Sequence, residues 1–265
     1  MTRIIVGQYY PTNSIIHRLD PRVKLIGAFA HITVLLMVNN FIGYAIATVY
    51  VAALVTSSKV PPRLMLRGLR AIFFMLLFAV TINLFLAPGD TVVFQLGFIR
   101  LTAEGLAGGA KMAMRLVLLV IGTSMLTLAT SPIKLTDGIE ALLRPLKIIK
   151  VPAHDIAMMM TITLRFIPIL ADEMSKIMKA QKARGADFDT GGLAKRAKSL
   201  LPVLVPLFVS AFKRADELAT AMEARCYRGD VGRTKMKQMK MTLADWLAIV
   251  IIAVIGTLTV LTRML

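Results

Sequence analysis

Apolar residues gather in five blocks separated by polar segments, a pattern typical of a protein that crosses a membrane several times. Only Asn39 and Asn40 lie between the first two blocks, which predicts a tight helical hairpin. Both of these blocks are short and need flanking residues to cover about 30 Å of hydrocarbon. Thr102 is a suitable N-cap that favours an earlier start of the fourth block, and Trp246 is a suitable interfacial anchor for the fifth. The blocks cover residues 25–38, 41–57, 71–88, 112–130 and 246–263.

Basic residues fall on alternate connections between the blocks, which predicts the orientation of the chain. The segment before the first block and the second connection are strongly basic, whereas the first connection is uncharged and the third is balanced. By the positive-inside rule, the N-terminus and the basic connections then lie in the cytosol, as five spans require. The basic residues are Arg3, Arg18, Arg22 and Lys24, then Lys59, Arg63, Arg67 and Arg70; the balanced connection carries Asp90, Arg100, Glu104 and Lys111.

The segment between the fourth and fifth blocks, residues 131–242, follows a different pattern. It carries 20 lysines and arginines against 11 acidic residues, and its apolar residues recur at helical spacing. This predicts two long amphipathic helices over residues 152–182 and 198–224, with a kink at Pro168 in the first. We therefore expect an all-α polytopic membrane protein with about five spans. Its expected parts are a membrane domain over 1–130, a cytosolic domain over 131–242 and a final span within 243–265.

Composition agrees with a membrane protein and narrows the range of partners. Of the 265 residues, 57% are hydrophobic, the mean hydropathy is +0.71 and the formal net charge is +17. Because the apolar blocks are nearly free of charge, the basic residues crowd into the segments between them. Such a balance fits nucleic acid, anionic lipid or an acidic protein partner. The single cysteine, Cys226, excludes an internal disulfide.

The sequence lacks the residue patterns of an enzyme. The nearest match to a phosphate-binding loop, from Gly105 to Lys111, has no adjacent Gly-Lys and no hydroxyl for Mg²⁺. The three histidines are far apart and none has the spacing of metal ligands, so we predict no catalytic residue, metal site or cofactor in this chain. His31 interrupts the first block, where a hydrogen-bonded packing role is commoner than a functional one. Gly105 and Gly109 form a small-residue pair that allows close helix approach, although the sequence identifies no partner helix.

Both long helices end in the same short pattern, an alanine, an arginine and a small residue. An arginine near a helix C-terminus is commonly just solvated, in favourable interaction with the helix dipole. A matched pair suggests a second interpretation, because small neighbours let another backbone approach and a guanidinium can then bind a carboxylate in bidentate fashion. Such a charge-assisted hydrogen bond contributes about 1.5–3 kcal/mol. The six residues are Ala183, Arg184, Gly185, Ala224, Arg225 and Cys226.

Methionine is frequent, with 17 residues, and several of them lie along the first long helix. Such a stripe is usually core filler. Methionine surfaces can also repack against different partners, so an adaptable contact face is the functional alternative.

Three features of the sequence together carry a family resemblance. They are the segment Leu19-Asp20-Pro21-Arg22-Val23-Lys24-Leu25, the segment Thr102-Ala103-Glu104-Gly105 and the paired Ala-Arg-Gly motifs. They resemble the transmembrane T component of energy-coupling factor (ECF) transporters, a branch of the ABC importers. The resemblance covers most of the chain, and the paired motifs are its most specific part. The second motif departs from the family pattern, because Cys226 stands in place of glycine.

The resemblance implies a role without catalysis. The two long helices would be coupling helices crossed in an X beneath the bacterial plasma membrane. Arg184 and Arg225 would each dock into one of two ABC ATPase subunits, which bind ATP and Mg²⁺. Apolar helix faces would carry a membrane-embedded S component that binds a vitamin or a metal ion. The implied contacts with the S component are Met159, Met160, Thr163, Leu164, Ile167, Leu204, Phe208 and Phe212.

Two unlike functions are also open to a basic membrane protein. An integral-membrane enzyme that acts on lipid needs Asp, His or Ser side chains converging on the inner ends of the spans, and the sequence shows no such cluster. A membrane-tethered nucleic-acid binder needs aromatic residues among the basic ones, but residues 131–242 have few aromatics and no tryptophan. A scaffold that couples ATPases to transport is the preferred hypothesis, with lipid as its surroundings and no nucleic acid as partner.

Overall fold

The computed structural model describes residues 9–86, 91–96, 99–188, 192–229 and 239–262. The all-α class is confirmed: the described chain is a series of helices, with one small antiparallel hairpin that the sequence did not predict. Arg3, Pro88, Asp90 and Arg263, which entered the predictions above, lie outside the described residues. The elements are α1 Ile15–Arg18, α2 Pro21–Met37, α3 Phe41–Ser58, α4 Pro62–Leu86, β1 Val92–Leu96, β2 Ile99–Thr102, α5 Ala103–Ala129, α6 Pro132–Leu143, η1 Arg144–Ile149, α7 Ala153–Ala183, α8 Leu193–Ala224 and α9 Leu243–Leu261.

The elements form two compact units. One contains η1, α7 and α8, and the other contains α1 to α6, the hairpin and α9. The predicted division of the chain at residues 131 and 243 separates parts within the membrane from a part in the cytosol. That division stays a prediction.

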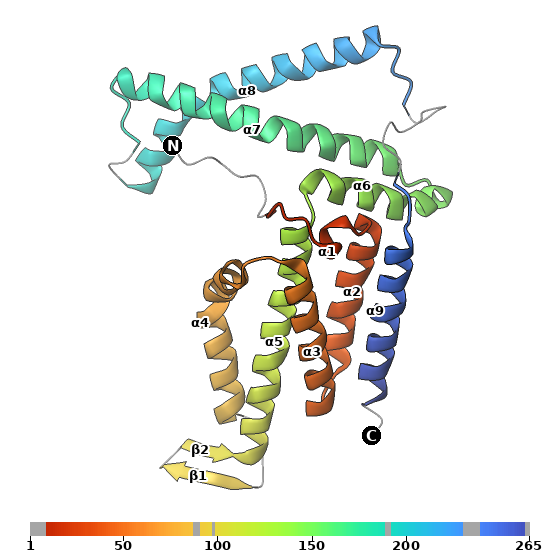
Figure 1. Ribbon diagram of the computed structural model, residues 1–265. Coiled ribbons are helices and arrows are strands. Elements are labelled where there is room, and N and C mark those ends of the chain that lie inside the picture. The colour runs from red at the N-terminus through yellow and green to blue at the C-terminus, as the bar shows by residue number, and fades with distance from the viewer. Residues whose placement is uncertain (1–8, 87–90, 97–98, 189–191, 230–238, 263–265) are drawn as a thin grey trace. The chain divides into compact units, whose positions relative to one another are not determined.

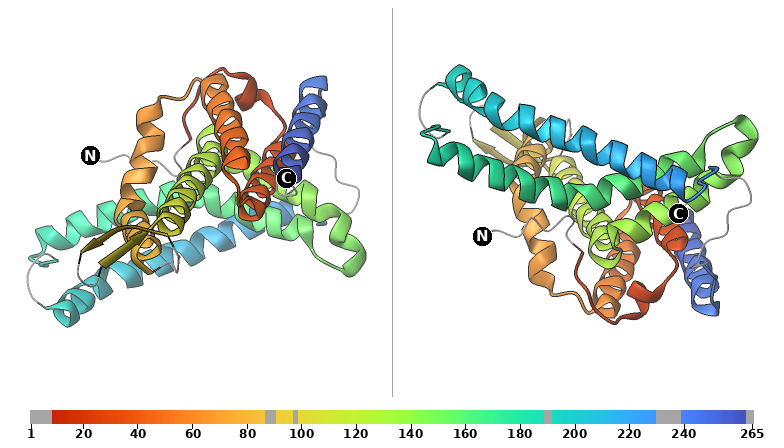
Figure 2. Two further views of the ribbon diagram at one scale, coloured as in Figure 1. Left: turned by 90° about the horizontal axis from the view of Figure 1, so that it is seen from below. Right: turned by 90° about the horizontal axis from the view of Figure 1, so that it is seen from above.

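The larger unit is a helix bundle in which segments far apart in the chain lie side by side. α2 contacts both α5 and α9, and α3 contacts the same two helices. Figures 1 and 2 show α5 between α4 and the hairpin formed by α2 and α3. Two apolar clusters fill the bundle: Leu35, Val38, Tyr44, Ala47, Val51 and Leu118, and then Val60, Met65, Met125 and Leu128.

The small-residue pair near the start of α5 has a partner helix after all, which is α4. A Cβ atom added to Gly105 would lie 2.9 Å from the Leu84 carbonyl oxygen, and one added to Gly109 would lie 3.7 Å from the Val80 carbonyl oxygen. The close approach of the two backbones therefore requires glycine at residue 105, whereas a Cβ atom at residue 109 would make only an ordinary contact. Thr102 caps α5 as predicted, since its hydroxyl accepts the Gly105 N–H at 3.1 Å.

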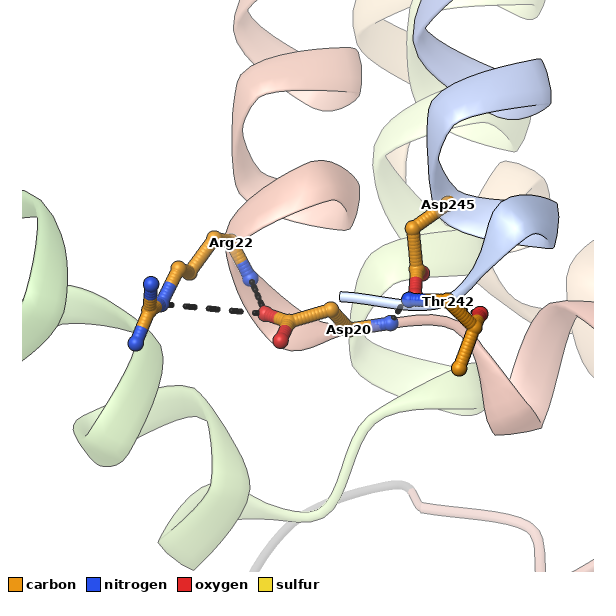
Figure 3. A network of polar contacts seen from close by, with 4 residues as sticks. All are labelled: Asp20, Arg22, Thr242 and Asp245. Carbon is orange, nitrogen blue, oxygen red and sulfur yellow. Dashed lines mark hydrogen bonds and ion pairs between the residues drawn. The ribbon is translucent and has the colours of Figure 1, made fainter. Parts of the chain in front are cut away.

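Both ends of α9 are tied to the α2–α3 hairpin by polar contacts. At its start, the buried Asp245 carboxylate accepts the Thr242 N–H at 2.8 Å and the Thr242 hydroxyl at 2.7 Å. Its other oxygen accepts the Asp20 N–H at 2.7 Å, and Asp20 in turn caps α2 (Figure 3). At its end, the Thr262 carbonyl oxygen accepts a hydrogen bond from the Asn40 side chain. The final helix is thereby fixed to the first hairpin although more than 200 residues separate them.

A second polar group that the sequence analysis missed is Arg115, near the start of the fourth apolar block. Its guanidinium donates to the Tyr44 hydroxyl at 2.9 Å, to the Val38 carbonyl oxygen at 2.6 Å and to the Asn39 amide oxygen at 2.9 Å. Arg115 therefore clamps the α2–α3 turn onto α5. A lone arginine within an apolar block was the signal for such a role, because ionisable side chains inside a bundle face protein partners.

Four described helices are long and apolar enough to cross a membrane, namely α3, α5, α7 and α9. α4 adds a fifth if its two halves, which meet at 61°, form one span. The number of spans agrees with the prediction, but two assignments differ. α2, predicted as the first span, has 17 residues and is at the short end of the range for a spanning helix. α7, predicted to be cytosolic, qualifies because its first half is rich in methionine and poor in charge, although it is the least apolar of the four.

Candidate functional site

α7 and α8 form an antiparallel pair held by a few specific contacts. The Arg214 guanidinium donates to a Glu173 carboxylate oxygen at 2.6 Å near the middle of the pair. Beyond the C-terminal end of α8, the Tyr227 hydroxyl lies 3.3 Å from the His154 ring and donates to the Met158 sulfur at 3.0 Å, so the chain that follows α8 returns to the start of α7. Figure 1 shows α8 crossing α7 and diverging from it toward the α8 C-terminus.

The internal prolines do not end the helices, and two of them create a contact between α7 and α8. α7 continues through Pro168, and α8 continues through Pro202 and Pro206. Because Pro206 has no N–H, the Pro202 carbonyl oxygen has no helical partner. The Gln181 side-chain amide of α7 donates to that oxygen at 3.4 Å, so a proline on one helix provides an acceptor for the other.

α7 ends in a Schellman motif built from the first arginine triplet. The Gly185 N–H donates to the Lys182 carbonyl oxygen at 3.0 Å, and the Ala186 N–H donates to the Gln181 carbonyl oxygen at 2.9 Å. Gly185 has a φ of 87°, a left-handed conformation that glycine adopts without steric cost. Arg184 is the C-cap residue, so its side chain leaves the helix at the last turn.

α8 ends in the same motif, with cysteine at the left-handed position. The Cys226 N–H donates to the Glu223 carbonyl oxygen at 2.8 Å, and the Tyr227 N–H donates to the Met222 carbonyl oxygen at 3.0 Å. Cys226 has a φ of 54°, and Arg225 is the C-cap residue. The small third residue of each triplet thus has a backbone role that sequence reasoning missed, although glycine just past a helix end is a known signal for it.

Both C-cap arginines are exposed, and neither guanidinium has a hydrogen bond or ion pair to the residues that the structure describes. Since α7 and α8 are antiparallel, Arg184 and Arg225 lie at opposite ends of the pair. α7 has 31 residues and is therefore about 45 Å long. Two separate partners can reach these ends at the same time.

An apolar surface accompanies the two arginines. Of the eight residues predicted to contact an S component, Leu164 is partly buried and the other seven are exposed. The largest exposed fractions are 57% for Met159, 63% for Phe208 and 74% for Phe212. α8 instead packs through a neighbouring face on which Val203 is buried. The phenylalanines are thus available to a partner, and that role stays a prediction.

Groups that would hold a metal are not found in the described part of the chain, where no three His, Cys, Asp or Glu side chains come together. Arg214 and Glu173 form a charged pair between α8 and α7, and both are partly exposed. The site therefore offers charge, apolar surface and fixed helix ends, which are the properties of a protein-docking surface.

A bundle of membrane-type helices followed by a pair of long helices defines an all-α polytopic membrane protein, and comparisons with known proteins identify its family. The model of the cobalt transport protein family, CbiQ, matches residues 12–237. The chain is 54% identical to the energy-coupling factor transporter transmembrane protein EcfT of Ruminiclostridium cellulolyticum, over 97% of this chain and 96% of that protein. It is 49% identical to EcfT of Thermosediminibacter oceani over 99% of both chains, and 45% identical to EcfT of Bacillus subtilis over 97% of both. The chain belongs to this family of ECF transporter transmembrane components.

Proposed function

We propose that this chain is the energy-coupling subunit of an ECF-type importer. Arg184 and Arg225 dock into two ABC ATPase subunits, and apolar faces of α7 and α8 carry a membrane-embedded S component that binds a vitamin or a metal ion. ATP and Mg²⁺ bind the ATPases, so hydrolysis takes place outside this chain. The observation that carries the proposal is the pair of exposed arginines on matching helix caps at opposite ends of one helix pair.

The cap geometry suits insertion into a partner groove. Each arginine stands beside a tight backbone turn whose hydrogen bonds are already satisfied. Nothing lies within 4 Å of a Cβ position at Gly185, so another backbone can approach there. An acidic groove on an ATPase would then receive a guanidinium that has no competing partner among the described residues.

The contacts between α7 and α8 give the pair a way to transmit force. Arg214 with Glu173, and Gln181 with Pro202, join the helices between their two docking ends. When ATP draws the two ATPases together, both ends are displaced and the crossing angle of the helices changes. The apolar faces of the same helices then carry that movement to the S component.

The orientation follows from the basic connections. The N-terminus and the segment of residues 131–242 lie in the cytosol of a bacterial cell, where the ATPases have access to ATP. In this arrangement the five spans are α2, α3, α4, α5 and α9, and α7 lies below the plasma membrane although its composition would allow it to cross.

A crossed pair of variants tests the proposal. In Arg184→Glu/Arg225→Glu, we expect the ATPases to be lost on co-purification from detergent-solubilised membranes and uptake to be abolished, while the S component is retained. In Phe208→Asp, we expect the reverse, with weakened S-component association and retained ATPases. Membrane insertion of both variants is the control. Full ATPase retention and unchanged uptake in the double charge reversal would refute the docking role.

A further inference from the structure

The short helix η1 and the residue that follows it form an exposed turn of cationic and aliphatic side chains. All seven residues from 144 to 150 are exposed, and Ile148 and Ile149 have exposed fractions of 91% and 68%. Three of the seven are basic and none is acidic: the basic ones are Arg144, Lys147 and Lys150. Two adjacent isoleucines held out on a turn need an explanation, because burying an aliphatic side chain of this size is clearly favourable.

The backbone of this turn is already satisfied. Lys150 has a φ of 62°, and its N–H donates to the Lys147 carbonyl oxygen at 3.0 Å. The Val151 N–H donates to the Leu146 carbonyl oxygen at 3.4 Å. A turn that pairs its own peptide groups can enter a region of low water content at little cost, which an open loop cannot do.

The side chains fit a lipid surface better than a protein. Three aliphatic side chains on one turn cover much less than the roughly 800 Å² per partner of a stable protein interface. Aliphatic residues flanked by lysine and arginine are instead the composition of segments that lie at the boundary of headgroups and acyl chains. The basic residues would meet phosphate groups while the isoleucines enter the acyl region, and the absence of acidic residues among the seven favours anionic headgroups.

The chain itself keeps the turn near the bilayer. α5, one of the helices that can cross a membrane, ends at Ala129, and η1 begins at Arg144. Only two connecting residues and the 12-residue helix α6 lie between them. Their combined length is at most about 30 Å, so η1 cannot lie far from the membrane surface.

We infer that η1 is an anchor that inserts Ile148 and Ile149 into an anionic phospholipid surface. The anchor would hold the start of α7 at the membrane, since α7 follows η1 after a short connection. This inference does not depend on the docking of ATPases at Arg184 and Arg225, and it can fail or hold separately.

The test uses the full chain in lipid nanodiscs. Cys226→Gly removes the single native thiol and Ile148→Cys accepts an environment-sensitive fluorophore. The quencher is a lipid with a doxyl group near the top of its acyl chain. One set of discs contains phosphatidylcholine alone and the other contains equal parts of phosphatidylcholine and phosphatidylglycerol. We expect quenching in the mixed discs to exceed that in phosphatidylcholine by about twofold or more.

A matched variant separates the roles of charge and apolar contact. Arg144→Gln/Lys147→Gln/Lys150→Asn removes the three charges, and asparagine tolerates the left-handed conformation at residue 150. We expect this variant to lose the preference for the mixed discs. An unquenched fluorophore in both kinds of disc would overturn the inference, as would quenching that is equal in both. A blue shift that requires added ATPase subunits would also overturn it, since the turn would then be a protein contact.

Discussion

At the scale of single residues, the Ala-Arg-small triplets act first as helix caps. Each triplet provides the last helical residue, the C-cap and the left-handed residue of a Schellman motif. The capping role and the proposed docking role are compatible, because the turn satisfies the backbone while the arginine side chain stays exposed. A left-handed conformation is costly for any residue with a Cβ atom, so glycine and cysteine are not equivalent at the third position.

Cys226→Gly should therefore stabilise the protein, by about 0.5–1 kcal/mol, because glycine removes the left-handed strain at some cost in chain entropy. Gly185→Ala should destabilise it by about 1 kcal/mol through the same strain, since the Cβ itself would meet nothing within 4 Å. Thermal unfolding in detergent measures both changes.

Gly192→Ala is the matched control for these two variants. Gly192 is equally open, with nothing within 4 Å of a Cβ position, but its φ is −68°. Gly192 is the N-cap of α8, where alanine is less favoured than glycine, so its replacement should lower the unfolding temperature only slightly and by less than that of Gly185. Equal losses at Gly185 and Gly192 would show that left-handed strain is not the cause.

At the scale of elements, the packing of α2 on α5 depends on one glycine. The His31 ring of α2 lies against Gly122 of α5, and its Nε2 atom is 3.1 Å from the Leu118 carbonyl oxygen. A Cβ atom on Gly122 would lie 2.1 Å from the same nitrogen. His31 is thus a hydrogen-bonded packing residue, which is the commoner role expected from the sequence.

Gly122→Ala should displace the His31 ring and destabilise the bundle by about 1–3 kcal/mol, the usual cost of overpacking. Gly68→Ala is the control, because its Cβ would meet the Ser124 hydroxyl at an ordinary 3.5 Å. Thermal unfolding of the two variants in the same detergent measures the difference. The packing account is contradicted if Gly122→Ala is as stable as Gly68→Ala.

The helices were largely predictable from the sequence, and their partners were not. The capping residue Thr102 located the start of α5. The helical spacing of apolar residues located α7 and α8 to within a few residues. α4 begins at Pro62, well before the predicted block, because arginines spaced along its first turns are compatible with a helix. The contacts of Asp245 with Asp20 and of Arg115 with Tyr44 join distant segments of the chain. The spacing of hydrophobic residues along the sequence carries no information about which distant side chains pair.

At the scale of the whole molecule, the main question is on which side of the membrane the ends of α7 lie. α7 is apolar enough to cross, and a crossing would put its two ends on opposite sides. In the proposed arrangement both ends are cytosolic. Asp155 in the first turn of α7 and Asp187 just beyond its end are both exposed and report on the two ends.

Cysteine labelling in intact cells distinguishes these arrangements. In a Cys226→Gly background, Asp155→Cys and Asp187→Cys should both resist a membrane-impermeant maleimide until the membrane is permeabilised. Labelling of one position but not the other in intact cells would make α7 a membrane span. The coupling-helix role would then need to be abandoned for that helix.

The claim on which the account depends is that the two arginine-bearing helix ends touch ATPase subunits. Photo-crosslinking in living cells tests it most directly, with a photoreactive amino acid placed at the exposed Ala183 or Ala224, beside each arginine, and at Phe74 of α4 as the control. We expect an ATPase adduct from each of the two helix ends and none from Phe74. If neither helix end gives an ATPase adduct in cells where the complex transports its substrate, the account is contradicted.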